Sequence, residues 1–349
     1  MISTTLFPPK LIAQHPAERR DEARLLVLDR RTGSLEHRTF GDLPEYLTPG
    51  DVLVINDTKV LPARLIGRKA SGGKIEVLLV RELSPPGPDR AAGEWECLVP
   101  RAGRLRAGAP LSFADDLQGE LLERGANGRW RISLKCQGIF RQVLERIGLP
   151  PLPPYIKRDG KGEAQAEDRD RYQTVYAREE GAIAAPTAGL HFTKALLERI
   201  RAKGVQALPL TLHVGVGTFL PVREMEIAGH RLEPESFFLS PETARAIGEA
   251  RAHGKKVFAV GTTAVRTLES CANDLGEIQP ARGETELFIT PGHRFRAVEA
   301  LVTNFHLPRS TLLMLVAAFA GRERILAAYA EAVRENYRFY SYGDAMLIL

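Results

Sequence analysis

An apolar run ends and a helix begins within nine residues of this chain, Ala185-Pro186-Thr187-Ala188-Gly189-Leu190-His191-Phe192-Thr193. Residues 181–185 are typical of a strand, and Thr193 is a suitable N-cap for the helix that follows. Ligands of α/β proteins bind at polar loops that follow the carboxyl ends of strands. This loop carries a histidine and a small hydroxyl residue, so it is a candidate part of a binding site.

The same pattern, a short apolar run followed by polar residues or glycine, occurs five more times. The residues that follow the runs are Asn56-Asp57-Thr58, then His213 with Gly215, Gly217 and Thr218, then Gly261-Thr262-Thr263, Thr290-Pro291-Gly292 and Thr303-Asn304-Phe305-His306. Because the ends of parallel strands meet on one face of a sheet, these loops predict one site assembled from distant sequence. Glycine, threonine and asparagine also form ordinary turns, which is the alternative for any single loop.

Four residues of these loops are candidates for acid–base catalysis: Asp57, His191, His213 and His306. A catalytic group must lie about 3 Å from its partner, or one water away, so we expect the four to share one cleft. We favour His191 as the base, because a loop directly before a helix fixes the orientation of its side chain. The alternative for each lone histidine is a hydrogen-bonded structural residue.

The composition is that of an ordinary globular protein, with 44% hydrophobic and 26% charged residues. A length of 349 residues favours two domains. The cysteines, Cys97, Cys136 and Cys271, have no paired spacing, which indicates neither disulfides nor a zinc site and fits a reducing compartment. The N-terminus lacks a signal-peptide pattern, and the longest apolar run, Leu312 to Ala320, is too short to span a bilayer. We expect a cytoplasmic protein without membrane contact.

Helix signals fall between the apolar runs. Helices are predicted after Thr193, from Ser240-Pro241-Glu242 to Gly254, after Thr263, and from Ser310. Alternation of strands and helices predicts an α/β domain with a mostly parallel sheet, open or barrel-like, formed by residues 1–60 and 153–349.

Residues 61–152 interrupt this alternation. Short β-like runs at 74–80, 95–99 and 129–134 are separated by turn clusters, and the proline-rich segment 150–154 reads as a stiff return linker. We predict a small antiparallel β-barrel domain at 61–152, inserted after the first parallel strand. Since that strand ends at Asn56 and Asp57, we expect the insert to lie over the polar face.

The insert also holds the whole formal charge excess of the chain. It contains 15 Lys and Arg against 10 Asp and Glu, whereas the remainder has 33 of each. Arg101, Arg104 and Arg106 form its densest basic cluster and are candidates for contact with a phosphate backbone. The alternative is a solvated basic face.

Neither a dinucleotide nor a metal is indicated. Gly215 and Gly217 follow an expected strand, but the third glycine of a dinucleotide loop is missing and Phe219-Leu220-Pro221 stands where a helix should begin. The histidines at 191, 213, 230 and 306 lack metal-ligand spacing. We expect no metal and no resident cofactor.

The chain resembles the S-adenosylmethionine:tRNA ribosyltransferase-isomerases of queuosine biosynthesis over nearly its whole length. Besides the opening stretch, the motifs that carry the resemblance are Asn56-Asp57-Thr58-Lys59-Val60, Pro62-Ala63-Arg64-Leu65, Tyr172 to Ala177, Leu212 to Phe219, Gly261-Thr262-Thr263, Arg266 to Ser270, Asn304 to Leu313 and Tyr340 to Leu347. One departure is that the segment from His230 to Glu235 lacks the second histidine of the family pattern.

The resemblance implies that S-adenosylmethionine is a co-substrate rather than a cofactor. Its ribosyl group would be transferred to 7-aminomethyl-7-deazaguanine at the wobble position of tRNA and isomerised, giving epoxyqueuosine, adenine and methionine. A monomer that binds the anticodon arm of tRNA is expected. The implied substrate-binding residues are Asn56, Thr58, Lys59, Tyr172, Tyr176, Thr187, Gly189, Gly215, Gly217, Thr218, Thr262, Thr263, Arg266, Asn304, Arg309, Tyr342 and Asp344.

Two other classes of function are compatible with the sequence: a non-catalytic tRNA-binding module and a metal-dependent hydrolase on a barrel-like scaffold. A binding module does not need acid, base and hydroxyl groups gathered at strand ends. A hydrolase would retain metal through purification. Release of adenine from S-adenosylmethionine in the presence of precursor tRNA separates both from the transferase.

Overall fold

The structure is a computed structural model that describes residues 8–84, 92–100, 102–103, 105–158, 162–215, 217 and 232–349. The chain divides into two compact units. The larger comprises Met1–Lys59, Pro153–Lys157 and Arg171–Leu349, and the smaller comprises Val60–Leu152 and Arg158–Asp170.

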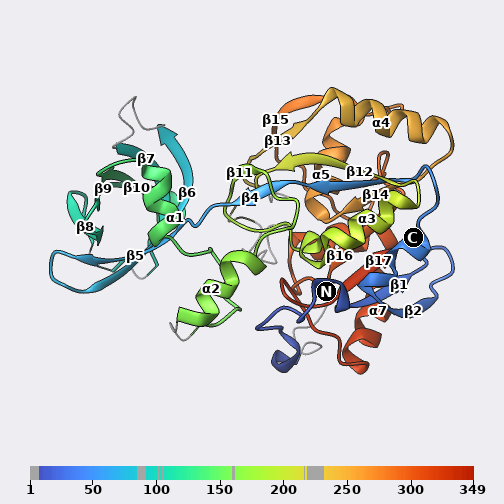
Figure 1. Ribbon diagram of the computed structural model, residues 1–349, viewed down its shortest axis with the longest axis horizontal. Coiled ribbons are helices and arrows are strands. Elements are labelled where there is room, and N and C mark those ends of the chain that lie inside the picture. The colour runs from blue at the N-terminus through green and yellow to red at the C-terminus, as the bar shows by residue number, and fades with distance from the viewer. Residues whose placement is uncertain are drawn as a thin grey trace. The chain divides into compact units, whose positions relative to one another are not determined.

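The larger unit is built on a nine-stranded mixed sheet (Figure 1). Its strand order is β15 (Ala281–Thr285), β13 (Glu235–Leu239), β12 (Gln206–Leu212), β3 (Val52–Asn56), β14 (Val257–Val260), β16 (Ala300–Asn304), β17 (Ala345–Ile348), β1 (Arg24–Leu28) and β2 (Leu35–Thr39). The central strands β12, β3, β14 and β16 are parallel, and the pairs nearest both edges are antiparallel. Every residue of β3, β14 and β16 is buried, as expected for strands covered on both faces.

Helices cover both faces of this sheet. One core contains Val52 and Val54 of β3 together with residues of α4 (Pro241–Ala252), α5 (Thr262–Cys271), α6 (Thr311–Ala320) and α7 (Arg322–Arg334). The other contains Leu53 and Ile55 with residues of α3 (Lys194–Ala202) and the 3₁₀ helix η4 (Phe40–Tyr46). Alternate residues of one strand therefore enter opposite cores, as the period of two requires.

The predicted helix starts at Thr193, Ser240 and Ser310 are confirmed. Each side-chain hydroxyl accepts a hydrogen bond from a backbone N–H in the first turn of its helix, and Pro241 occupies the first position of α4. The α/β class and the inserted antiparallel β-barrel are confirmed as well.

Two of the predicted parallel strands are wrong. Only the first two residues of the run 181–185 belong to a strand, β11 (Glu179–Ala182). Among the described residues, β11 pairs only with β4 (Thr58–Val60), in a two-stranded sheet separate from the main one. Residues 287–289 form no strand, because the Leu287 carbonyl accepts a hydrogen bond from Arg266 Nε instead of a neighbouring strand. Short apolar runs do not distinguish strands from other buried segments.

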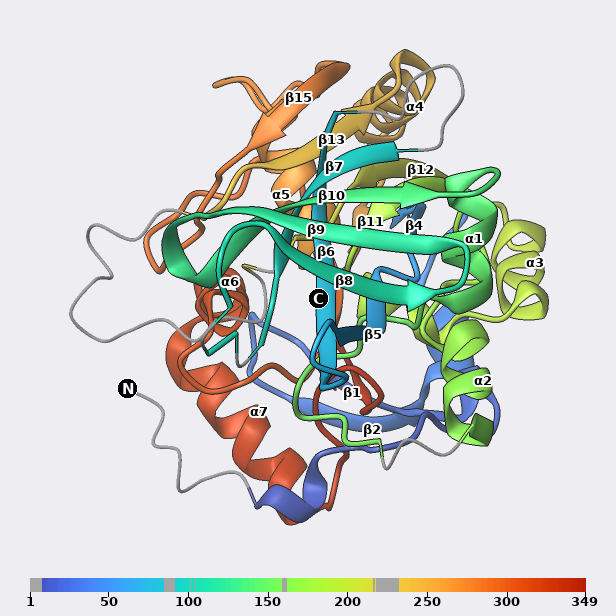
Figure 2. The same cartoon turned by 90° about the vertical axis from the view of Figure 1, so that its left-hand side faces the viewer.

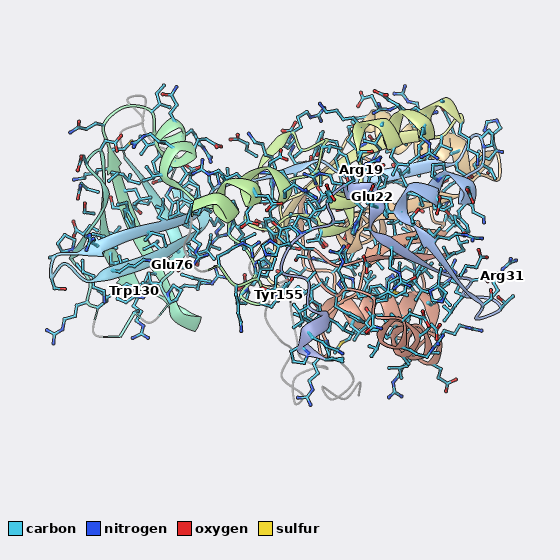
Figure 3. All side chains as sticks on the ribbon, turned by 60° about the horizontal axis from the view of Figure 1, so that its bottom comes forward. Arg19, Glu22, Arg31, Glu76, Trp130 and Tyr155 are labelled. Carbon is cyan, nitrogen blue, oxygen red and sulfur yellow. The ribbon has the colours of Figure 1, made fainter. Side chains whose placement is uncertain are left out.

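The smaller unit is a closed antiparallel barrel. Its order is β10 (Arg129–Cys136), β7 (Ala92–Leu98), β6 (Lys74–Ser84), β5 (Arg64–Lys69), β8 (Ala109–Ala114) and β9 (Leu117–Arg124), and Figure 2 shows β8, β9 and β10 side by side. Inward residues alternate with exposed ones, and Trp130, labelled in Figure 3, is buried. This unit also contains α1 (Phe140–Ile147) and nearly all of α2 (Gly162–Arg171).

The remaining short elements are 3₁₀ helices: η2 (Pro9–Leu11), η3 (Arg20–Glu22), η5 (Ala126–Gly128) and η6 (Thr187–His191). Among the described residues, each helix is too short or too polar to cross a membrane.

Replacement of Gly148, which ends α1, should destabilise the barrel. A Cβ there would lie 2.0 Å from the Pro62 carbonyl oxygen and 2.6 Å from that of Leu144. Because both atoms are backbone, Gly148→Ala should lower the free energy of unfolding by about 1–3 kcal/mol. Denaturant titration followed by tryptophan fluorescence is a selective measurement, since both tryptophans, Trp95 and Trp130, lie in this unit.

The matched control is Gly73→Ala in the same unit. The nearest atom to a Cβ at Gly73 is Ser71 Oγ at 3.7 Å, so this change should leave the midpoint nearly unaltered. Equal midpoints for the two variants would contradict the steric argument.

Candidate active site

A cleft opens at the carboxyl ends of the central parallel strands. It is partly open to solvent. Its walls include residues 185–188, Val214 beyond β12, residues 261–263 beyond β14, residues 303–307 beyond β16, Ser310 and Leu312 at the start of α6, Tyr155, and Tyr340 with Ser341. The cleft therefore gathers four of the loops that the sequence marked as strand ends.

The start of α5 forms one wall. Gly261 precedes the helix with a φ of 87°, a conformation that side-chain-bearing residues adopt rarely. Its N–H donates to the Val302 carbonyl on β16, and Thr262 and Thr263 then face the cleft. The glycine thus lets β14 turn sharply into α5 and places two hydroxyl groups at the ligand side.

Asn56 braces the floor of the site from β3. Its Oδ1 accepts from the N–H groups of Leu212 and Thr58, at 3.1 Å each, and its Nδ2 donates to the Leu212 carbonyl at 3.0 Å and to Thr263 Oγ1 at 3.2 Å. The fully buried amide therefore ties together β3, β4, β12 and α5. In this structure Asn56 serves as a brace for residues that line the cleft.

Asn304 links the cleft to His191. Its Nδ2 donates to the carbonyls of Tyr340 and Ser341, so its Oδ1 is the atom that meets His191 Nε2 at 3.3 Å. Because an amide oxygen can only accept, His191 carries its proton on Nε2 and holds a lone pair on Nδ1. Burial lowers the pKa of His191 to about 4. His191 lines a neighbouring smaller cavity with Arg20 and Tyr342.

Among the histidines that the structure describes, His306 lines the main cleft. Its Nε2 lies 2.7 Å from Thr303 Oγ1, and its backbone N–H donates to the Tyr329 hydroxyl. Burial lowers the pKa of His306 to about 3, so the ring is neutral at neutral pH.

Asp57 and His213 do not line this cleft, so the four candidate catalytic residues are not gathered in it as expected. Asp57 accepts from Thr211 Oγ1 at 2.7 Å and pairs with Arg178 at 3.0 Å, and burial raises its pKa. His213 Nδ1 lies 2.8 Å from Thr58 Oγ1, and burial lowers its pKa. Asp57 is held by Thr211 of β12 and by Arg178, and His213 is held by Thr58 of β4, so the hydrogen bonds of both side chains go to residues outside the cleft lining.

Arg266 forms a buried ion pair with Glu235. Both side chains are 6% exposed, and Glu235 also accepts the Gly215 N–H at 2.9 Å. Arg266 donates to the Leu287 and Thr285 carbonyls in addition. These contacts join α5, β13 and the loop after β12. Arg266, which the resemblance implied as a substrate-binding residue, therefore has a structural role here.

Other expected residues surround the site in different ways. Thr187 lines the cleft, and Gly189 leaves room for the Tyr176 hydroxyl, which would lie 2.2 Å from a Cβ there. The hydroxyls of Tyr172 and Tyr176 are buried, that of Tyr176 has no hydrogen-bond partner among the described residues, and burial raises both pKa values.

The remaining expected residues lie farther out or outside the described part of the chain. Lys59 pairs with Glu180 at 2.9 Å, Asp344 accepts from the Arg24 and Arg338 N–H groups, and Arg309 is exposed with a φ of 58°. Tyr342 lines the smaller cavity, and Gly217 lies beside Glu233. Thr218, His230, Arg101 and Arg104 lie outside the described residues, and Arg106 is exposed.

Sequence reasoning did not single out Tyr155 and Ser341 as site residues, whereas Thr303 belongs to a loop that it assigned to the site. Tyr155, labelled in Figure 3, lines the cleft, and its hydroxyl lies 2.7 Å from Ser341 Oγ. It follows the prolines that were interpreted only as a linker, so an aromatic residue at that point was the available signal. Among the described residues, no three His, Cys, Asp or Glu side chains are grouped as metal ligands.

Fold and cleft together define an α/β protein with an inserted β-barrel and a candidate active site at parallel strand ends. A family model described as "Queuosine biosynthesis protein" matches residues 6–348. The S-adenosylmethionine:tRNA ribosyltransferase-isomerases of Syntrophotalea carbinolica and Desulforamulus reducens are 53% and 51% identical to this chain, each covering 98% of it and 97% of the relative. A crystal structure of S-adenosylmethionine tRNA ribosyltransferase from Thermotoga maritima is 41% identical, with a TM-score of 0.55 and 98% of both chains covered.

The chain therefore belongs to the S-adenosylmethionine:tRNA ribosyltransferase-isomerase family. The resemblance inferred from the motifs is confirmed.

The buried histidines should make the protein acid-labile. Their pKa values fall from 6.5 to about 4 for His191 and to about 3 for His306, so the unfolded chain takes up protons that the folded chain cannot. Stability should therefore drop as the pH falls from about 6.5 towards 4, by up to about 1.4 kcal/mol per pH unit for each histidine. Urea unfolding at pH steps between 7.5 and 4.5 measures this slope. His191→Gln should reduce it, and an unchanged slope would contradict a buried neutral His191.

Proposed function

We propose that the cleft binds S-adenosylmethionine and that ribosyl transfer to tRNA takes place there. The family reaction transfers the ribosyl group of S-adenosylmethionine to 7-aminomethyl-7-deazaguanine at the tRNA wobble position and isomerises it, giving epoxyqueuosine-tRNA, adenine and methionine. The observation that carries the proposal is a cleft at the parallel strand ends that is walled by five of the motifs shared with the family. A tRNA substrate also fits a cytoplasmic location and a protein that acts as a monomer.

The substrate supplies its own activation. The sulfonium acidifies the adjacent ribose carbon, so loss of a proton there can start the expulsion of adenine. The amine of the tRNA base then adds to the ribose, and ring closure to the epoxide releases methionine. The protein must provide a base, stabilise departing adenine and exclude water.

His306 is the base in this proposal. It lines the cleft, whereas His191, which the sequence favoured, meets the cleft only through Asn304. The Thr303 hydroxyl donates to the Asn304 carbonyl at 3.4 Å, so its oxygen accepts a hydrogen bond from His306 Nε2. The proton of the His306 ring is therefore on Nε2, and the lone pair on Nδ1 is left for the substrate. His191 then acts as a positioning residue that holds Asn304.

The β-barrel is the proposed tRNA-binding unit. Its segment carries the whole net charge of +5, and Arg106 is exposed. Together with Arg101 and Arg104 it would contact phosphates of the anticodon arm, while the larger unit holds the small substrate and the target base. Phosphate contacts position a nucleic acid without reading its sequence.

Adenine release tests the proposed site. With precursor tRNA and S-adenosylmethionine, the wild-type protein should release adenine, and His306→Gln should lower kcat by about 10²–10⁴-fold because the base is lost. His191→Gln should have a smaller effect. Chromatographic detection of adenine measures both. Wild-type turnover that His306→Gln leaves intact would remove His306 from the mechanism, and a wild-type protein that releases no adenine would favour the binding module.

A salt series tests the basic cluster. Replacing Arg101, Arg104 and Arg106 by Ala should weaken tRNA binding. The slope of the logarithm of the binding constant against the logarithm of the salt concentration should become shallower by roughly 0.7–0.9 for each phosphate contact that is lost. The KM for S-adenosylmethionine at saturating tRNA should stay the same. The control, with equal loss of charge, replaces the exposed Arg31, Arg201 and Arg322 of the larger unit. Equal weakening by both triple variants would show that only net charge matters.

A further inference from the structure

The N-terminus of α5 presents unpaired donors to the cleft. The first backbone N–H that bonds within this helix is that of Val265, to the Gly261 carbonyl, so those of Thr262, Thr263 and Ala264 have no backbone acceptor among the described residues. Gly261 has no side chain to cap them, and the first turn contains no acidic residue. These N–H groups carry the partial positive charge of the helix end.

Two hydroxyl groups add donors at the same place. The Thr262 side chain lines the cleft and is only 6% exposed, yet its hydroxyl has no hydrogen-bond partner among the described residues. Thr263 Oγ1 accepts from Asn56 Nδ2, which cannot accept in return, so the Thr263 hydroxyl proton is available to an acceptor in the cleft. Both threonine side chains are more than nine-tenths buried, so an acceptor that enters the cleft would complete their hydrogen bonding.

The charge of the cleft limits what that acceptor can be. None of the described residues that line it is Lys, Arg, Asp or Glu. Helix-end N–H groups and hydroxyls suit an anion, but without a basic side chain they suit a singly charged one better than a phosphate. A carboxylate that enters with its own positive charges meets this requirement.

We propose that the N-terminus of α5, with the Thr262 and Thr263 hydroxyls, binds the α-carboxylate of the methionine part of S-adenosylmethionine. The inference rests on the proposed function of the cleft. It also fits the position of His306, because α5 follows β14 and His306 follows the adjacent parallel strand β16. Neighbouring strands are about 4.8 Å apart, a distance that the short methionine chain spans between its carboxylate and its sulfur. The sulfonium and the acidified ribose carbon then lie on the His306 side.

A substrate analogue without the carboxylate tests the assignment. Decarboxylated S-adenosylmethionine competes with S-adenosylmethionine in the adenine-release assay at saturating tRNA, whether or not it is turned over. For the wild-type protein, its Ki should exceed the KM of S-adenosylmethionine by about 10- to 100-fold, because charge-assisted hydrogen bonds are lost. Thr262→Val and Thr263→Val should each raise the KM about three- to tenfold and leave the Ki of the analogue nearly unchanged.

Two further variants separate binding from folding. Thr262→Ser keeps the hydroxyl and should retain the wild-type ratio of Ki to KM. Thr267→Val alters a buried hydroxyl one turn later in α5, which donates to the Thr263 carbonyl rather than to the cleft, and should also retain the ratio. Because the carboxylate is remote from the reacting carbon, kcat should change little in the two cleft variants.

The outcomes distinguish this inference from the function on which it rests. If the wild-type protein releases adenine but binds both compounds equally, or if Thr262→Val weakens both equally, the carboxylate assignment is wrong and the proposed function stands. A wild-type protein that releases no adenine from S-adenosylmethionine and precursor tRNA overturns both.

Discussion

The buried amide of Asn56 is the constraint on which the architecture of the site depends. A buried asparagine side chain is costly unless both its oxygen and its nitrogen are paired, and here its hydrogen bonds go to β4, β12 and α5. The amide sets the relative positions of three chain segments that are distant in sequence. Because Asn56 Nδ2 donates to Thr263 Oγ1, it also leaves the Thr263 hydroxyl proton free to donate to a ligand in the cleft.

A second buried amide, that of Asn304, acts in the same way on the other side of the cleft. Two main-chain carbonyls fix its orientation, and the orientation fixes the tautomer of His191. Burial of His191 and His306 keeps both rings neutral, as their lowered pKa values show. A neutral cleft suits a substrate that brings its own sulfonium, because a protonated histidine would repel it.

The start of α5 differs from the starts of α3, α4 and α6, because it has no side-chain cap. Thr193, Ser240 and Ser310 cap α3, α4 and α6, and each hydroxyl accepts one backbone N–H from the first turn of its helix. Gly261 leaves the start of α5 uncapped where the helix meets the cleft. The cost of unpaired N–H groups is tolerable there because a ligand can supply the acceptor.

Local sequence signals determined the helix starts, the central strands and the division into an α/β part and a β-barrel. Hydrophobic runs, capping hydroxyls and turn residues act over a few neighbouring positions, so they can be read without the fold. The motifs also identified the family. The sequence did not show that residues 181–185 and 287–289 leave the main sheet, because a short apolar run is equally compatible with burial in a loop.

Only the tertiary structure decided which polar residues face the cleft and which hold the framework. Asn56, Arg266 and Asp57 look like site residues in the sequence, yet their hydrogen-bonding groups are used by other parts of the protein. His306, Thr262 and Tyr155 face the cleft because β14, β16 and the segment after the barrel converge there. Hydrogen-bond partners across 100 or more residues depend on packing in three dimensions, which no local pattern encodes.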